Sequence, residues 1–265
     1  PWHVRPGRDR DWYERGYAEA LDKATFAKNY PATVAEALAP LQGLAFFNLD
    51  TLSRIHQPRV LQPIETRGLV RIFKGPMLAG RYVAASDVGH GLGRDYSVTG
   101  ILDAATGVVV ADIFTNVSGL DEFTLATVEM LRLYRSPLWA CEDNEWGIAV
   151  IRGARTLGYT RMYNRDETGK TEKWGWHTDD RTRWPMWNEL AEAMDAGNLI
   201  IPAADGLAQF YTVIRSPKRG GRPEAMEGAH DDYPTMLAIA WQMRKYAGRG
   251  AVAARSGPIL RAPSW

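Results

Sequence analysis

The stretch GAHDDYPTMLAIAW, residues 228–241, sets two adjacent carboxylates before an apolar run. The apolar residues of that run recur at helical spacing, which predicts a helix packed against a core. Asp231 and Asp232 stand at the start of this helix. Acids are common in a first helical turn, because the helix dipole and the free N–H groups there favour them. The pair alone therefore fits both an ordinary helix start and a functional site.

Two further acidic positions follow predicted strands earlier in the chain. Residues 82–87 predict a buried strand that ends in Asp87, and residues 138–142 predict a short strand that ends in Glu142. A glycine-rich loop after the first of these strands carries Asp95. Mg²⁺ and Mn²⁺ prefer oxygen ligands and keep several waters, so a few carboxylates and a substrate phosphate suffice to bind them. Three converging carboxylate positions are the minimum for such a site.

Composition indicates a globular protein without a dominant charge. The chain has 265 residues, of which 45% are hydrophobic and 24% charged, enough for a sizeable core. Its net charge of +1 does not indicate a nucleic-acid binder, so that function would have to depend on local basic clusters. The single cysteine, Cys141, excludes an internal disulfide and is expected to be a buried thiol. No apolar run approaches the roughly 20 residues of a membrane span, and we expect no secretory leader because no basic stretch followed by an apolar one opens the sequence.

Differences in composition and in predicted structure divide the chain into three parts. Residues 1–75 predict an N-terminal helical and irregular extension, residues 76–247 a folded domain, and residues 248–265 a flexible tail. The expected strands cover residues 69–73, 82–87, 97–103, 108–116, 138–142, 161–163, 199–201 and 209–214. The expected helices cover residues 122–134, 147–157 and 182–196, and a last one starts at Asp231.

The order of elements in the domain predicts an α/β fold. Short connections make the first three strands of the domain an antiparallel meander. The fourth strand, after a helix, is then expected beside the first in a mixed five-stranded sheet flanked by helices. The acids at the ends of these two strands, Asp87 and Glu142, would meet there. A helix docked beside them would bring the third acidic group.

This order and spacing resemble the RNase H-like nuclease domain of the large terminase subunit of tailed bacteriophages. The first motif of that family resembles SDVG at residues 86–89, with Asp95 following in the loop. The second resembles EDNEWG at residues 142–147, and the third resembles GAHDD at residues 228–232. Supporting matches are GWHT at residues 175–178 and YPATVAEA at residues 30–37. The likeness extends from about Phe26 to Arg244.

The resemblance implies a role for each acid. Asp87, Glu142 and Asp231 are expected to bind the metal, and Asp232 a second ion. Asp95 is expected to add a further group at the second ion. Asp143 competes with Glu142 for its role, and alternation along a strand favours Glu142. His230 fits two roles, either orienting water or the phosphate during catalysis, or forming a cap or surface group.

Basic residues gather in two places and are candidates for contact with DNA phosphates. The first group is the loop that carries Lys218, Arg219 and Arg222. The second comprises Lys170, Lys173, Arg181 and Arg183. For each of them the alternative is an ordinary solvated charge. Trp174 and Trp176 are expected to pack in the core rather than to stack on bases.

A second motif, TGKT at residues 168–171, is similar to a phosphate-binding loop but lacks its context. Asn164 stands where the loop requires a glycine, and no strand-to-helix frame surrounds it. We therefore expect no ATP site in this chain. Terminase large subunits have an ATPase domain ahead of the nuclease, so residues 1–75 are expected to lead from that motor.

The function that the resemblance implies is cleavage of concatemeric viral double-stranded DNA during genome packaging. The enzyme would be an endonuclease that depends on two Mg²⁺ or Mn²⁺ ions. Two such ions about 4 Å apart activate a water and stabilise the leaving oxygen in phosphodiester hydrolysis. The implied partners are DNA, an ATPase domain, a small terminase subunit and the portal of the procapsid. The implied location is the host cytoplasm, without secretion or membrane attachment.

Three alternatives stay open. The same fold serves Holliday-junction resolvases and RNA–DNA hybrid nucleases. A different class is a non-catalytic module that docks on a portal or on DNA. The intact set of acids argues against the last of these.

Overall fold

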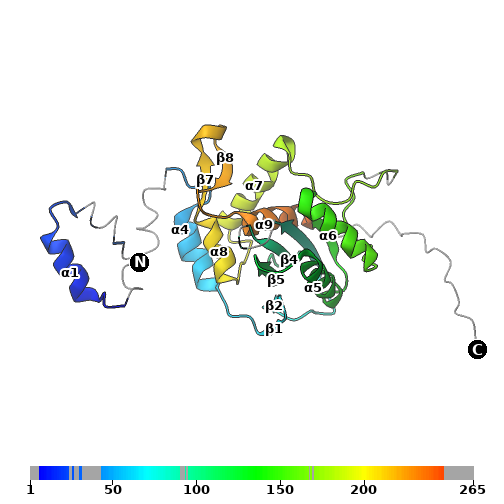
Figure 1. Ribbon diagram of the computed structural model, residues 1–265, viewed down its shortest axis with the longest axis horizontal. Coiled ribbons are helices and arrows are strands. Elements are labelled where there is room, and N and C mark those ends of the chain that lie inside the picture. The colour runs from blue at the N-terminus through cyan, green and yellow to red at the C-terminus, as the bar shows by residue number, and fades with distance from the viewer. Residues whose placement is uncertain are drawn as a thin grey trace, which may run out of the picture.

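A six-stranded mixed sheet forms the centre of the molecule (Figure 1). The computed structural model describes residues 6–23, 26, 30–31, 43–89, 93, 95–166, 168 and 170–247. The strands are β1 (Glu65–Arg67), β2 (Val70–Ile72), β3 (Tyr82–Val88), β4 (Ser97–Asp103), β5 (Val109–Thr115) and β6 (Leu138–Cys141). They lie in the order β1-β2-β5-β4-β3-β6. As predicted, β3, β4 and β5 form an antiparallel meander, and β6 pairs in parallel with β3.

Helices cover both faces of this sheet. They are α4 (Leu49–Thr51), α5 (Leu120–Leu133), α6 (Glu145–Thr156), α7 (Asp180–Asp195), α8 (Ala204–Phe210) and α9 (Asp232–Met243), whereas α1 (Arg10–Glu19) buries no residue and lies apart from the sheet (Figure 1). One core lies between the sheet and α5 and α6, and a second lies between the sheet and α7, α8 and α9. Side chains along β3 alternate between these cores, because Val83 and Ala85 face α9 whereas Ala84 and Val88 face α5 and α6.

Helix α9 lies directly on β3 and β4. Gly100 in β4 makes this approach possible, since a Cβ atom there would come within 2.6 Å of Met236 Sδ. Ten residues of α9 are buried, among them Tyr233 and Met236. The start of α9 is therefore held near the end of β3 that carries Asp87.

Three expected strands are wrong or reduced. Residues 161–163 and 199–201 form only isolated bridges, in which Met162 pairs with Trp139 and Ile200 with Val108. Residues 204–210 form α8 where a strand was expected to begin, because Leu207 and Phe210 at helical spacing bury one face. The strand begins only at β7 (Val213–Ser216), which forms a hairpin with β8 (Arg222–Ala225).

The expected linker contributes to the sheet and the core. The hairpin of β1 and β2 supplies two of the six strands, because β2 pairs with β5. Phe46, Phe47 and Leu52 are buried in the same core as α9. The boundary after residue 75 stays a prediction, and packing continues across it. The tail at residues 248–265 lies outside the described residues.

Two smaller expectations have structural counterparts. Cys141 is a buried free thiol, as predicted. Among the helices that the structure describes, none combines the length and the apolar character required to cross a bilayer.

Candidate functional site

Asp87 and Glu142 lie side by side where β3 and β6 end. Ser86 faces the α5 side of the sheet, where its hydroxyl group bonds to Thr99 and accepts from Trp139 Nε1 at 2.8 Å. Alternation therefore turns Asp87 toward α9. The backbone N–H of Glu142 donates to the Ser86 carbonyl at 2.9 Å, which continues the pairing of β6 with β3 by one residue.

The start of α9 brings the third and fourth acids. Asp231 occupies the N-cap position of α9, but its side chain makes no capping hydrogen bond. Elsewhere in the chain Asp179 caps α7 and Asn144 caps α6 with such bonds. An ordinary capping role therefore does not explain Asp231. Asp232 follows it with its side chain only 14% exposed.

The charges of these acids act on one another. Burial raises the pKa of Asp87 well above its usual value, and the charges of Glu142, Asp232 and Asp231 raise it further. Burial together with the charge of Asp231 raises the pKa of Asp232 to about 7. Burial also raises the pKa of Asp231, although a nearby arginine opposes the shift. These mutual effects mean that the structure brings all four predicted acids into one neighbourhood, the acid cluster.

The acid cluster has the chemistry of a site for a hard cation. Within the residues that the structure describes, Asp232 Oδ2 is buried without a hydrogen-bond partner, and His230 Nδ1 lies 3.6 Å from it. A buried carboxylate oxygen without a partner is unfavourable, and a divalent cation would supply one. Within the described part of the chain, no three acidic, histidine or cysteine side chains are already arranged around one ion position. The donor set, carboxylate oxygens at the ends of β3 and β6 and at the start of α9, fits Mg²⁺ or Mn²⁺.

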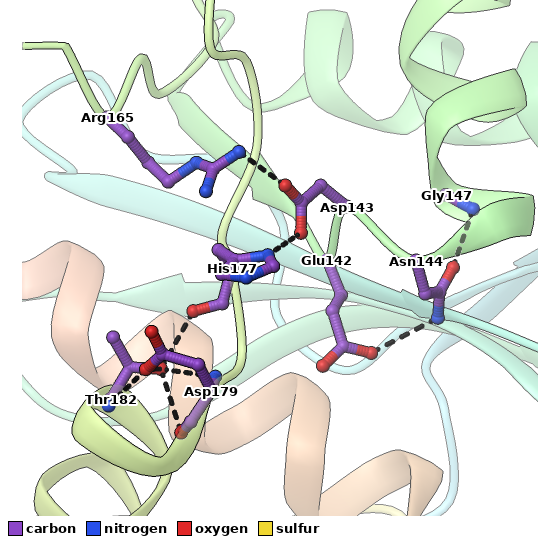
Figure 2. A network of polar contacts seen from close by, with 8 residues as sticks. All are labelled: Glu142, Asp143, Asn144, Gly147, Arg165, His177, Asp179 and Thr182. Atoms are coloured by element: carbon purple, nitrogen blue, oxygen red, sulfur yellow. Dashed lines mark hydrogen bonds and ion pairs between the residues drawn. The ribbon is translucent and has the colours of Figure 1, made fainter.

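Glu142 and Asp143 point in different directions (Figure 2). Asp143 accepts a hydrogen bond from Arg165 and lies 2.8 Å from His177 Nδ1. Glu142 turns away from these two residues, toward Asn144. Because Asp143 already has two partners outside the acid cluster, the geometry favours Glu142 as the acid that serves it.

Asn144 holds Glu142 in place, a role that the sequence prediction missed. Its Nδ2 donates to Glu142 Oε2 and to the Val88 carbonyl, both at 3.1 Å, and its Oδ1 accepts from the Gly147 N–H at 2.7 Å. Gly147 is required at its position, since a Cβ there would lie 1.9 Å from the Glu142 carbonyl oxygen. The available signal was an asparagine directly before a helix start, where it also caps α6.

Asp95 and His230 flank Asp232. Asp95 is exposed, and its charge contributes to the raised pKa of Asp232. The His230 ring packs edge-on against Tyr96 with 5.0 Å between the ring centroids. Both residues are thus at the rim of the acid cluster.

Arg183 differs from the expectation of an exposed basic residue. Its side chain is only 15% exposed and lies 3.6 Å from Asp231 Oδ2. It also donates to the Pro223 carbonyl at 2.9 Å. Arg183 lies near the start of α7, and its guanidinium faces β8 and the start of α9 rather than solvent. Arg183 therefore belongs to the acid cluster, where it partly balances Asp231.

The other basic residues are on the surface. Lys218 and Arg219 are exposed in the turn between β7 and β8, a hairpin that projects beyond the sheet (Figure 1). Arg219 lies 3.5 Å from Glu224, and Arg222 lies 3.8 Å from Asp180. In the second group, Lys170, Lys173 and Arg181 are exposed.

Comparison with known proteins confirms the expected fold. No family model and no curated protein sequence matches the chain. The nuclease of the large terminase of thermophilic phage G20c has a TM-score of 0.59 at 18% identity, covering 75% of this chain and 98% of that one. The nuclease domain of the Thermus phage P74-26 large terminase has a TM-score of 0.58 at 18% identity, covering 75% of this chain and 95% of that one. The G20c nuclease is also known with bound magnesium and with bound cobalt. The RNase H-like mixed sheet with flanking helices is thus the fold of this chain.

Proposed function

We propose that this chain is a divalent-metal-dependent endonuclease that cleaves concatemeric viral double-stranded DNA during genome packaging. The observation that carries the proposal is the acid cluster, in which four carboxylates converge and Asp232 Oδ2 has no hydrogen-bond partner among the described residues. The fold shared with phage terminase nucleases supports it.

Each side chain then has a role. Asp87, Glu142 and Asp231 would hold one Mg²⁺ or Mn²⁺, and Asp232 would contribute to a second. When bound, two such ions activate a water and stabilise the leaving oxygen. The chain itself aligns the carboxylates, because β3, β6 and α9 fix their backbones. Burial removes water from around these carboxylates, so a cation becomes the favourable partner for their negative charge.

Three neighbours support these acids. Asn144 orients Glu142, and Arg183 holds Asp231. His230 lies 3.6 Å from Asp232 Oδ2, within reach of a water or a phosphate at the rim. Asp95 would add to the second ion from the other side of the rim.

The surface charges suit DNA as a substrate. Lys218, Arg219, Arg222, Lys170 and Lys173 would contact backbone phosphates, which carry no base information, so cleavage should be largely independent of sequence. The proposed setting is the packaging motor in the host cytoplasm. There the partners would be an ATPase domain, a small terminase subunit and the portal of the procapsid.

The test is nicking of supercoiled plasmid in the presence of Mn²⁺ or Mg²⁺. We expect the Asp231→Ala variant to lose about 100-fold or more in rate, because metal binding supplies several kcal/mol of stabilisation to the transition state. Asp121→Ala is the matched control, since Asp121 is an exposed acid on α5. If the wild-type chain nicks no faster than Asp231→Ala, the proposal is wrong.

Substrate choice and metal binding separate the alternatives. Preference for a four-way junction or an RNA–DNA hybrid over plain duplex would assign a resolvase or a hybrid nuclease. A non-catalytic docking module would show no thermal stabilisation by Mn²⁺. For the proposed enzyme, Mn²⁺ at about 100 times its Kd should stabilise the fold by about 2.7 kcal/mol.

A further inference from the structure

A cavity of about 340 Å³ lies beside α6, and its lining includes Asp143, the residue after Glu142, but none of the four acids of the acid cluster. Four basic side chains line it: Arg152, Arg155, Arg165 and Lys173. Trp174 forms part of the wall, and the guanidinium of Arg155 lies 5.4 Å from its ring centroid. The cavity thus combines an aromatic wall with an excess of basic groups.

The acidic groups in this cavity are already paired. Glu172 accepts from Arg155 at 2.9 and 3.1 Å, and Asp143 accepts from Arg165. Arg152 and Lys173 form no ion pair with any acid that the structure describes. Two positive charges therefore remain for a ligand.

Arg165 indicates what kind of ligand the cavity suits. Its Nε is buried and has no hydrogen-bond partner in the described structure, although its Nη2 is bonded to Asp143. A buried N–H group without an acceptor is unfavourable, so an acceptor-rich ligand would be stabilised there. A phosphate fits best, because guanidinium groups bind phosphate oxygens in a planar, forked geometry.

We propose that this cavity binds a backbone phosphate of the DNA strand. The inference rests on the proposed nuclease function for the identity of the ligand. It also explains a connection in the structure, because Arg165 is joined to Asp143, the residue that follows Glu142 (Figure 2). A strand whose phosphate occupies the cavity would lie at the end of β6, where Glu142 also stands. The cavity is thus a positioning site for the substrate outside the catalytic centre.

The experiment measures DNA affinity without cleavage. Arg152 and Lys173 are both exposed, so the double variant Arg152→Gln, Lys173→Gln should keep the fold, which a thermal melt verifies. A fluorescein-labelled duplex is titrated in EDTA at several salt concentrations, and Kd is read from anisotropy. We expect binding weakened about tenfold and a salt slope reduced by about 1 to 2.

The matched control is Lys74→Gln. Lys74 is exposed after β2, far from β6 and α6 in the order of the sheet, and should leave Kd and the salt slope unchanged. A double variant with the affinity and slope of the wild type would overturn the inference. So would stabilisation by inorganic phosphate that the double variant loses while its affinity for DNA stays intact, because the cavity would then serve a free anion.

The two proposals fail in different ways. A chain that does not nick plasmid but loses DNA affinity in the double variant retains the phosphate site and loses the nuclease function. A chain that nicks plasmid while the double variant binds as tightly as the wild type retains the nuclease function and loses the phosphate site.

Discussion

Asp112 and the acid cluster both lie against the start of α9, and they differ in how their charge is balanced. Asp112 in β5 is fully buried and accepts two hydrogen bonds from Arg71, at 2.7 and 2.9 Å, and one from the Tyr233 hydroxyl at 2.8 Å. Asp232 is the residue before Tyr233, yet no described residue forms a hydrogen bond with its Oδ2. Two adjacent residues of α9 thus differ in their surroundings. Tyr233 belongs to a network whose hydrogen bonds are complete, whereas Asp232 belongs to a cluster of acids with an unbonded oxygen.

This difference separates a structural role from a functional one. Both oxygens of Asp112 are satisfied by groups of the chain itself. Arg71 also binds Asp205 at 2.6 Å, and the Tyr233 N–H donates to Gln209 Oε1 at 2.7 Å, so β2, β5, α8 and α9 are joined. The chain balances the acid cluster only in part, through Arg183 beside Asp231. Buried charges without compensation are unfavourable, and they gather where function requires them.

Removing the charge of Asp112 should give the largest change in stability. Asp112→Asn leaves the guanidinium of Arg71 with a weakened partner below the surface, so we expect the free energy of unfolding to fall by about 3 kcal/mol. Urea denaturation measures it. Asp121→Asn, on an exposed turn of α5, should change it by less than about 1 kcal/mol. If Asp112→Asn lowers the free energy of unfolding no more than Asp121→Asn does, Asp112 has no structural role and the comparison fails.

The stability of the metal-free protein should depend on pH through Asp232. The pKa of this group is raised to about 7 in the folded state, against about 3.9 in an unfolded chain. Between these values the folded state binds more protons, so stability falls as pH rises from about 4 to about 7 and then levels off. The titratable groups that face it are Asp231, Asp95 and His230. Burial also raises the pKa of Asp87 and of Asp231, so both groups lower stability in the same direction as pH rises.

The measurement is urea unfolding in EDTA at pH 5, 6 and 7. We expect a loss of about 1 kcal/mol per pH unit. In the Asp232→Asn variant the free energy of unfolding should fall less steeply with pH, because one of the groups with a raised pKa is absent. An equal slope in the two proteins would mean that Asp232 is not held in an unbalanced, buried state.

Local patterns predicted the parts of the fold that depend on neighbours in sequence. Alternation and short hairpin turns predicted β3, β4 and β5, and helical periodicity predicted α5, α6, α7 and α9. Of the hairpin of β1 and β2, only β2 was predicted, as the strand at residues 69–73. All of β1 is exposed, so its sequence carries no alternation of buried and exposed residues. Its place at the edge of the sheet depends on the pairing of β2 with β5.

The acids of the candidate site could be predicted, whereas most of their partners could not. Asp87, Glu142 and Asp231 follow predictable strand ends or precede a predictable helix, so topology brings them together. The inward turn of Arg183 and the bonds of Asp143 to Arg165 and His177 join segments distant in sequence. Periodicity within one segment carries no information about which distant side chain it will meet.

The smallest expected effect tests the comparison most sharply, because Asp87→Asn should stabilise the metal-free protein whereas Asp112→Asn should destabilise it. Asp87→Asn removes one charge from a cluster of like charges, so in EDTA at pH 8 we expect the free energy of unfolding to rise by about 1 kcal/mol. The same substitution at Asp112 lowers it. Urea denaturation in EDTA and in Mn²⁺ measures both, and in Mn²⁺ the wild type should become the more stable protein. If Asp87→Asn instead destabilises the metal-free chain as much as Asp112→Asn does, Asp87 serves the fold, and the acid cluster is not held ready for a cation.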